Sequence, residues 1–440
     1  MGRPSSPLSA HLPPLIMGTA TFNSQYNHDP YALPTTELVH RALTDGVRAF
    51  DTSPYYGPAE ELLGRALASE TVRTVFPRHT YQILTKVGRI ASSSFDYSPR
   101  WIRHSIRRSL QRLHTDYLDA VYCHDVEFVS RAEALNAVRE LRRIRDTEGT
   151  IRYVGISGYP VDVLCEVAEL VLRETGEPLD IVQSYANFTL QNTKLLSQGL
   201  PRLAAAGVDV VPNASPLGMG LLRRKGVPIG SMGDFHPAPD GLRNAVLAAG
   251  EWADTQEGEK LEVIAIRFAL EAWLRDGAKV GARGPPLACA PNDGRDLVPV
   301  ATKGAAKRLG VSVMGVSNVD ELNETLRVWR SIIDGLENDD DEQQQPSASL
   351  TPSEENISDR AWSQDCQRRV SSLAQQIQAI LGPEWVDFTW ASPGPDFVNT
   401  LPPNHLSSLE EAEKGAAKAG LNAESSVSAP VETVDKTALI

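Results

Sequence analysis

Four polar side chains fall where three predicted strands end. Asp51 follows the apolar run VRAF, and Tyr56 lies five residues later in FDTSPYYG. Lys86 closes the run YQILTK, and His124 closes YLDAVYCH. Each residue alone has an ordinary structural explanation, because aspartates cap turns, lysines at strand ends are solvated and histidines are often packed. Together, on neighbouring strands, they predict one cluster.

Such a cluster is suited to proton transfer. A tyrosine with a free pKa of about 10 is too weak an acid or base for neutral pH. We expect the Lys86 ammonium to favour the phenolate of Tyr56 and to lower its pKa. Asp51 would keep Lys86 charged and in place, while the imidazole of His124 would orient a substrate oxygen. Since no side chain supplies hydride, redox chemistry here would require a bound cofactor.

The elements that would position this cluster alternate along the chain. Between about residues 15 and 335, eight short apolar runs typical of strands alternate with amphipathic stretches typical of helices. One helix begins at the Ser-Pro of SPRWIRHSIRRSLQRLH, a sequence that suits a helix N-terminus. The alternation predicts an α/β fold, and eight repeats favour a (β/α)8 TIM barrel over an open doubly wound sheet. No GxGxxG motif follows the first strand, so a Rossmann site is not indicated.

Segments outside the alternation divide the rest of the chain. Residues 277–310, rich in Gly, Pro and Ala, are predicted to form a surface insertion before the eighth strand. The remaining boundaries follow from composition: a flexible N-terminus over 1–11, the barrel over 12–336, an acidic disordered linker over 337–360, a helix with a packing segment over 361–398, and a disordered tail over 399–440.

Composition narrows the class of protein. The net charge of −13 argues against nucleic acid as a partner, because phosphate binding needs a basic face. No apolar run approaches the roughly 20 residues that span a bilayer, so no membrane partner is expected. The four cysteines, Cys123, Cys165, Cys289 and Cys366, form no metal-binding pattern, and no metal is expected. These features predict a cytoplasmic protein with reduced thiols, which we expect to be a monomer.

The residues around the cluster resemble a known family. The run FDTSPYYGPAEELLGRAL looks like the aldo-keto reductase signature, with Asp51, Tyr56, Gly57, Glu60 and Gly64 in register. The runs LQRLHTDYLDAVYCH, GTIRYVGISGY, SPLGMGLL and VMGVSNVDEL are similar to further blocks of that family. The resemblance implies a nicotinamide-dependent oxidoreductase with Asp51, Tyr56, Lys86 and His124 as its catalytic tetrad.

The same resemblance implies a cofactor site. Ser157 occupies the position that holds the nicotinamide amide, although its usual neighbour Asn is Gly158 here. Gln183 matches the other amide contact. Three residues match the loop beside the pyrophosphate, namely Ser215, Leu217 and Gly220.

Two departures from the common family pattern indicate cofactor and substrate. NADP-preferring relatives carry Lys and Arg where this chain has Gly315 and Glu321, which favours NAD over NADP because a carboxylate repels a phosphate. Glu324 resembles the adenine-contacting position. Ala214 replaces a stacking tyrosine, as in the D-arabinose and L-galactose 1-dehydrogenase subgroup, which implies a sugar substrate oxidised at C1 to a lactone. Three further residues are candidates for the sugar pocket: Tyr55, Arg89 and Trp101.

Two alternatives stay open at this point. An NADPH-dependent aldehyde or ketone reductase would use the same tetrad in the opposite direction. A barrel that senses the redox state of its cofactor would use the insertion and the acidic tail as docking surfaces for a partner. Fold alone does not decide among these hypotheses.

Overall fold

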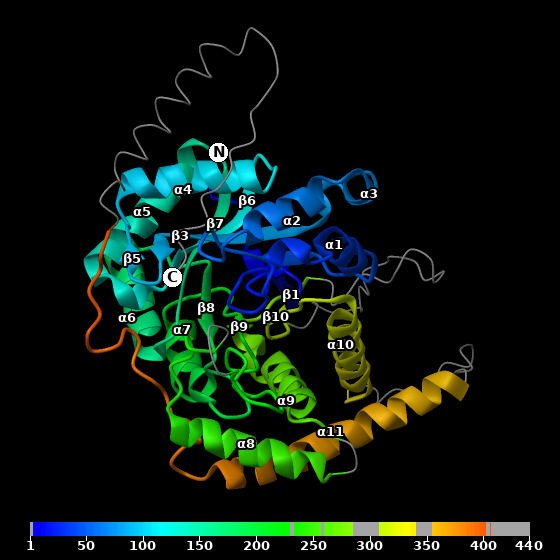
Figure 1. Ribbon diagram of the computed structural model, residues 1–440. Coiled ribbons are helices and arrows are strands. Elements are labelled where there is room, and N and C mark those ends of the chain that lie inside the picture. The colour runs from blue at the N-terminus through cyan, green and yellow to red at the C-terminus, as the bar shows by residue number, and fades with distance from the viewer. Residues whose placement is uncertain are drawn as a thin grey trace. The chain divides into compact units, whose positions relative to one another are not determined.

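Eight parallel strands close into a barrel with helices around it in the computed structural model (Figure 1). The order of neighbouring strands around the barrel is β1-β10-β9-β8-β7-β6-β3-β2, so each barrel strand lies beside the barrel strands that come before and after it in the sequence. Their bounds are β1 (Leu15–Gly18), β2 (Ala49–Asp51), β3 (Gln82–Val87), β6 (Leu118–His124), β7 (Ile151–Gly158), β8 (Ile181–Tyr185), β9 (Asn213–Ala214) and β10 (Ser312–Gly315). The predicted (β/α)8 barrel is confirmed.

The structure describes residues 3–228, 233–256, 259–284, 308–339, 354–401 and 405. The chain divides into two compact units, Met1–Asn399 and Thr400–Ile440. The first unit contains the barrel and the helices around it. In the second, only residues 400, 401 and 405 are described.

Helices follow the strands as the alternation predicts. Ser98 caps the helix that begins at Pro99 by accepting a hydrogen bond from the Trp101 N–H at 3.3 Å, so the Ser-Pro start is confirmed. The helices are α1 (Thr35–Thr44), α2 (Ala59–Ala68), α3 (Glu70–Arg73), α4 (Pro99–Arg112), α5 (Arg131–Thr147), α6 (Val161–Thr175), α7 (Leu200–Ala205), α8 (Asp240–Asp254), α9 (Leu261–Asp276), α10 (Val319–Asp339) and α11 (Glu354–Leu381). A short hairpin of β4 (Arg89–Ala91) and β5 (Ser94–Phe95) follows β3.

The strand register explains why side chains distant in sequence meet. Asp51 pairs with Gly18, and Gly18 in turn pairs with Gly315. On the other side of the barrel, His124 pairs with Ser157, and Ser157 pairs with Gln183. Because parallel strands all end at the same rim, these residues line one edge of the barrel.

The opposite end of the barrel is closed by the N-terminal segment. Leu8 and Leu12 are buried in one cluster with Ile16 and other side chains of the barrel interior. The Ser9 N–H also donates to Asp209 Oδ2 at 2.8 Å. Residues 1–11, which we expected to be flexible, are therefore partly structured from the 3-10 helix Leu8–Ala10 onward, because burying two leucines stabilises that end of the barrel.

Both ends of the predicted insertion over 277–310 are structured. Residues Gly277–Val280 form a 3-10 helix, and the Val280 carbonyl accepts from the Val211 N–H at 2.8 Å. Ala282 and Leu309 form an antiparallel bridge, so the two ends of the segment are built into the barrel wall. Residues 285–307 lie outside the described residues.

A C-terminal helix packs against two barrel helices. Four side chains of α11 (Leu373, Ala374, Ile377 and Leu381) are buried with residues of α8 and α9. The segment after it, drawn in orange in Figure 1, runs from the end of α11 past α8 to β5, where Asn399 bonds the backbone of Phe95. Residues 337–339 continue α10 and 354–360 belong to α11, so both ends of the expected disordered linker are helical, whereas 340–353 lie outside the described residues.

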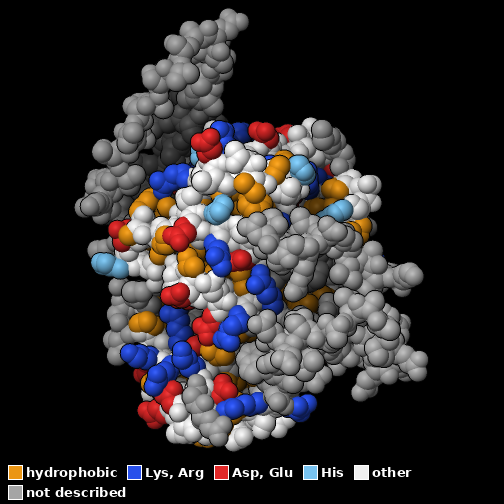
Figure 2. All heavy atoms as spheres, turned by 90° about the vertical axis from the view of Figure 1, so that its right-hand side faces the viewer, with side chains coloured by type: hydrophobic (Ala, Val, Ile, Leu, Met, Phe, Trp, Pro, Cys, Tyr) orange, Lys and Arg blue, Asp and Glu red, His pale blue; other side chains and the backbone are white. Residues whose placement is uncertain are grey.

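The surface carries mixed charges. On the face shown in Figure 2, Lys and Arg side chains lie among Asp and Glu side chains. Exposed pairs such as Arg202 with Glu169 and Arg224 with Asp254, each 2.8 Å apart, contribute at most about 1 kcal/mol each. Within the described part of the chain, no helix is long and apolar enough to cross a membrane, and no three His, Cys, Asp or Glu side chains gather as metal ligands would.

Candidate functional site

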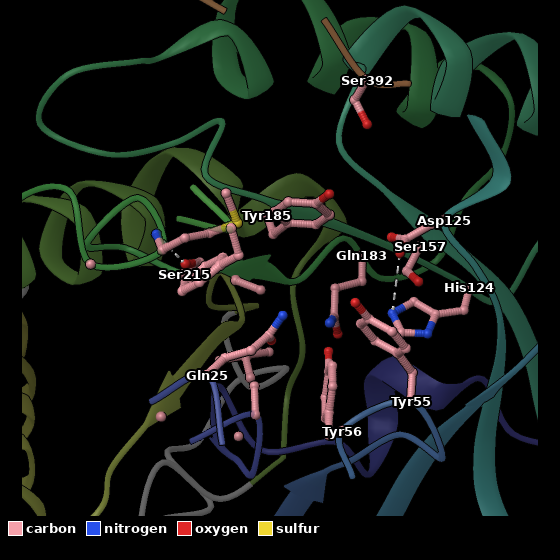
Figure 3. Close-up of a pocket in the computed structure, with 18 of the residues that line it drawn as sticks. Gln25, Tyr55, Tyr56, His124, Asp125, Ser157, Gln183, Tyr185, Ser215 and Ser392 are labelled. Atoms are coloured by element: carbon pink, nitrogen blue, oxygen red, sulfur yellow. Dashed lines mark hydrogen bonds and ion pairs between the residues drawn. The ribbon is translucent and has the colours of Figure 1, made fainter. Parts of the chain in front are cut away.

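A cavity of about 490 Å³ opens at the rim where the strands end. Residues that end or follow the barrel strands line it, and aromatic side chains form part of its walls. The residues that line the cavity include Asp51, Tyr55, Tyr56, Lys86, Arg89, His124, Asp125, Ser157, Gln183, Tyr185, Ser215, Leu217, Gly220, Gly315, Trp390 and Ser392. Figure 3 shows Tyr56, His124 and Gln183 pointing into the same part of the cavity.

A buried ion pair forms the floor of this site. Lys86 Nζ lies 2.6 Å from Asp51 Oδ1 and donates to the Thr52 carbonyl at 2.9 Å. Both side chains are almost inaccessible to solvent. Burial raises the pKa of Asp51, and Lys86 offsets part of that effect. The geometry fixes the ammonium 4.8 Å from the centre of the Tyr56 ring.

His124 lies beside Tyr56 and is neutral. The two ring centroids are 5.8 Å apart and the rings are nearly perpendicular. His124 Nδ1 is 3.1 Å from Ser53 Oγ, which fixes the orientation of the imidazole. Burial lowers the pKa of His124 to about 3, and the nearby Lys86 and Arg89 act in the same direction. At neutral pH the uncharged imidazole can therefore form a hydrogen bond with a substrate oxygen.

The direction predicted for the pKa of Tyr56 is wrong for the free protein. Burial raises this pKa well above its ordinary value, and the Asp51 and Asp125 carboxylates act in the same direction. The prediction counted the charge of Lys86 alone. In the structure Asp51 pairs directly with Lys86, and burial together with the Asp51 carboxylate outweighs the ammonium.

Two polar atoms at the strand ends lack partners. Ser157 and Gln183 pair in register across β7 and β8, and both line the cavity. Ser157 Oγ and Gln183 Oε1 are buried, and neither has a hydrogen-bond partner among the described residues. An unpaired buried polar atom costs about 1–3 kcal/mol, so these atoms mark a place where a ligand's polar group would be stabilised.

The loop after β9 adopts a conformation that depends on small residues. Backbone φ is positive at Ser215, Gly218, Met219 and Gly220. The Met219 N–H donates to Ser215 Oγ at 2.8 Å, which stabilises the turn. The structure brings Ser215, Leu217 and Gly220 to the cavity wall. The sequence predicts that all three belong to one loop beside the cofactor.

The sequence places Gly315, Glu321 and Glu324 near the adenine and ribose end of the cofactor. The structure brings only one of these residues to the cavity. Gly315 ends β10 and lines the cavity. Glu321 and Glu324 are exposed on α10 and do not line it. Glu321 Oε2 accepts from the Ser317 N–H at 2.7 Å, so this carboxylate caps the N-terminus of α10 in the free protein.

Several cavity residues escaped the sequence reasoning. Asp125 follows His124 directly, and Tyr185 ends β8, so their positions at strand ends were a usable signal. Trp390 and Ser392 come from the segment after α11, well beyond the last barrel motif VMGVSNVDEL, and no pattern pointed to them. Of the three proposed pocket residues, Tyr55 and Arg89 line the cavity. Trp101 does not, because it packs against His104 on α4.

The C-terminal segment is held at the cavity by a buried carboxyl group. Glu127 Oε1 accepts from Ser392 Oγ at 3.0 Å and from the Tyr159 N–H at 3.1 Å. A Cβ atom at Gly158 would lie 2.4 Å from Glu127 Oε2, which explains why glycine stands where the family usually has asparagine. Burial, reinforced by Asp125, raises the pKa of Glu127 to about 8.

This shift makes stability depend on pH in a defined direction. Because the folded state binds the proton of Glu127 more tightly than the unfolded chain, its contribution to stability is complete below about pH 4.3 and is lost as pH rises through about 8. We expect Glu127→Gln, which keeps the shape without the charge, to flatten the fall in Tm between pH 5 and 9. The exposed Glu148→Gln serves as control, and identical pH dependence of Tm in the two variants would contradict the assignment.

The sequence of the chain is similar to that of known proteins. Residues 14–336 match the model of the aldo/keto reductase family. The chain is 42% identical over 273 residues to the D-arabinose 1-dehydrogenase of Saccharomyces cerevisiae, covering 62% of this chain and 79% of that one. It is 37% identical over 238 residues to the L-galactose dehydrogenase of Arabidopsis thaliana, covering 53% and 68%.

The fold is found among solved structures as well. The glycerol dehydrogenase from Gluconobacter oxydans superimposes with a TM-score of 0.50 at 18% identity, covering 89% of this chain and 98% of that chain. At this identity the likeness concerns the architecture only.

Proposed function

Since the chain belongs to the aldo-keto reductase family, we propose that it oxidises an aldose at C1 to the lactone, with a nicotinamide dinucleotide as hydride acceptor. The sugar would be of the D-arabinose or L-galactose type. Two relatives support this choice by their names, one a D-arabinose 1-dehydrogenase and the other an L-galactose dehydrogenase.

The observation that carries the proposal is the cluster of Tyr56, Lys86, Asp51 and His124 inside one cavity. The Tyr56 hydroxyl is the proton-transferring group that faces the cavity beside a neutral imidazole. Asp51 and Lys86 hold each other in a fixed geometry beneath it. General acid–base catalysis needs a positioned group of this kind and contributes about 10²–10⁴-fold to a rate.

The roles of the chain's own residues follow from this geometry. His124 binds the oxygen at C1 through a hydrogen bond and brings the hydroxyl of the sugar to Tyr56. The phenolate form of Tyr56 takes the proton of that hydroxyl. Lys86, held charged by Asp51, stabilises the phenolate electrostatically while it exists. The aromatic side chains among the cavity walls would help to exclude water from the reacting oxygen.

The cavity fits a nicotinamide. The amide group of this cofactor carries both donors and an acceptor, and the unpartnered Ser157 Oγ and Gln183 Oε1 offer complementary groups. Ser215, Leu217 and Gly220 would lie along the pyrophosphate, and Glu324 would face the adenine. When bound, the nicotinamide ring supplies the acceptor for the C1 hydride.

NAD is the proposed cofactor in preference to NADP. A phosphate is attracted to the N-terminus of a helix by its partial positive charge. Glu321 occupies that position on α10 and neutralises it. Gly315 adds no cation there. Both residues disfavour the additional phosphate of NADP.

The rate should depend on pH mainly through Tyr56. Because the pKa of Tyr56 is raised, the phenolate is scarce at pH 7 and increases about tenfold per unit of pH. We expect kcat/KM for aldose oxidation to rise steadily from pH 7 to 10. His124, with its pKa of about 3, adds no inflection near pH 6.5. An inflection there, or a plateau from pH 7, would show that another group limits the reaction.

The proposal is tested by the absorbance of reduced nicotinamide. The purified full chain is given NAD or NADP together with D-arabinose or L-galactose. Reduction of NAD by at least one sugar, with NADP a poorer acceptor, is the expected result. Oxidation of NADPH by simple aldehydes, with neither sugar oxidised, would instead establish the reductase.

A further inference from the structure

A second charged pair lines the cavity and has no role in the proton transfer described above. Arg89 Nη1 bonds Asp125 Oδ2, and Arg89 Nη2 donates to the Tyr55 hydroxyl at 3.0 Å. The guanidinium also lies 3.8 Å from the centre of the Tyr55 ring. Burial opposes ionisation of Asp125, but His124 and the Arg89 guanidinium together outweigh it and hold the pKa of Asp125 below its ordinary value.

The backbone is bent to bring Asp125 into the cavity. Successive side chains of a strand point to opposite faces, so the residue after His124 would normally point away. Asp125 instead adopts the left-handed conformation, with φ 56° and ψ 62°. His124 and Asp125 therefore both line the cavity. A left-handed non-glycine residue is uncommon, and such strain concentrates at functional sites.

Asp125 keeps one acceptor atom available. Its Oδ2 bonds Arg89 and lies 3.6 Å from His124 Nε2. Within the part of the chain that the structure describes, its Oδ1 makes no hydrogen bond. Figure 3 shows the carboxylate beside His124, at the edge of the space into which Tyr56 points. A purely structural ion pair would not need a free oxygen facing a cavity.

The position of this oxygen defines what it would bind. If His124 holds the oxygen at C1, the carboxylate of Asp125, 3.6 Å from His124 Nε2, would face a substituent close to C1. A carboxylate accepts hydrogen bonds and donates none, so its partner is a hydroxyl group. The hydroxyl on the carbon next to C1 meets both conditions.

We infer that Asp125, positioned by Arg89, accepts a hydrogen bond from the C2 hydroxyl of the aldose and makes the site selective for sugars that carry this hydroxyl. The inference rests on the proposed function. A hydrogen bond to a charged group is among the stronger ones, and its loss leaves Asp125 Oδ1 without a partner while Oδ2 stays bonded to Arg89. The predicted selectivity against a 2-deoxy sugar is about ten- to a hundredfold in kcat/KM.

Matched sugars make the test sharp. D-arabinose and 2-deoxy-D-ribose differ only in the C2 hydroxyl, and L-galactose and 2-deoxy-L-galactose form the second pair. The ratio of kcat/KM within the pair that the protein oxidises is measured for the wild type and for Asp125→Asn. We expect the variant to lose most of its activity toward the hydroxylated sugar and little toward the deoxy sugar, so that the ratio falls toward one.

Two further variants separate recognition from structure. The double variant Asp125→Leu with Arg89→Met removes both charges and leaves no unpaired ion, so it should fold and show the same low ratio. Asp119→Asn breaks another buried pair, Asp119 with Arg78 at 2.7 Å, at the far end of β6. This control lowers stability and leaves the sugar ratio unchanged.

Three results would contradict the proposed role of Asp125. Equal losses toward both sugars in the Asp125 variants would make Asp125 a structural residue and overturn the inference alone. A wild type that does not distinguish the paired sugars would overturn it as well. A wild type that oxidises no sugar at all would overturn the proposed function, and this inference with it.

Discussion

Tyr56→Phe should lower kcat/KM for aldose oxidation by about a thousandfold or more while leaving the fold intact. The substitution removes one oxygen and keeps the ring that packs beside His124 and above Lys86. Without the hydroxyl, the sugar loses its proton acceptor, since a pKa of about 3 makes His124 too weak a base to replace Tyr56. Steady-state kinetics and thermal melting of the purified variant measure the two expectations.

The neighbouring tyrosine provides the control. Tyr55 also lines the cavity, and its ring lies 6.3 Å from that of Tyr56. Its hydroxyl bonds Arg89 rather than facing the reacting position. Tyr55→Phe should therefore cost far less than Tyr56→Phe. Similar losses in the two variants, or substantial activity in Tyr56→Phe, would remove Tyr56 from its proposed role.

Lys86→Met should destabilise the protein by about 3–5 kcal/mol. The substitution leaves Asp51 buried without the partner that lies 2.6 Å away, and Asp51 Oδ2 already lacks a hydrogen bond among the described residues. An unpaired buried charge of this kind is costly because nothing replaces its solvation. Urea unfolding at constant pH measures the loss, and activity should disappear as well.

The double variant Asp51→Leu with Lys86→Met separates the two effects. Replacing both members of a buried pair by apolar residues of similar size is often neutral for stability. We expect the free energy of unfolding to return close to that of the wild type, whereas activity should stay absent. If the free energy of unfolding stays low in the double variant, the pair matters for packing rather than for charge.

The barrel and the principal cluster could be predicted from the sequence for a simple physical reason. Parallel strands covered by helices read as alternating apolar runs, and their ends meet at one rim. Asp51, Lys86 and His124 each closed a predicted strand, so proximity followed from the topology. The observed register, with His124 opposite Ser157 and Ser157 opposite Gln183, joins the cofactor positions to the same cluster.

Other features depend on contacts that no local pattern records. The pKa of Tyr56 rises because the ring is buried and because the Asp51 and Asp125 carboxylates lie near it, and neither cause is visible in residue spacing. β9 is reduced to two residues, next to Pro212, although VDVVPNAS reads as a full strand. Trp390 reaches the cavity only because α11 docks on α8 and α9. Asp125 lines the cavity only because its backbone is left-handed.

The central claim is that hydride leaves C1 of an aldose while Tyr56 takes the proton. The most direct measurement uses D-arabinose and L-galactose labelled with deuterium at C1, incubated with the protein and NAD. Mass spectrometry of the products should find deuterium in the reduced nicotinamide and an unlabelled lactone from the sugar. Reduced nicotinamide without deuterium, or a product that keeps the label at C1, would contradict the account.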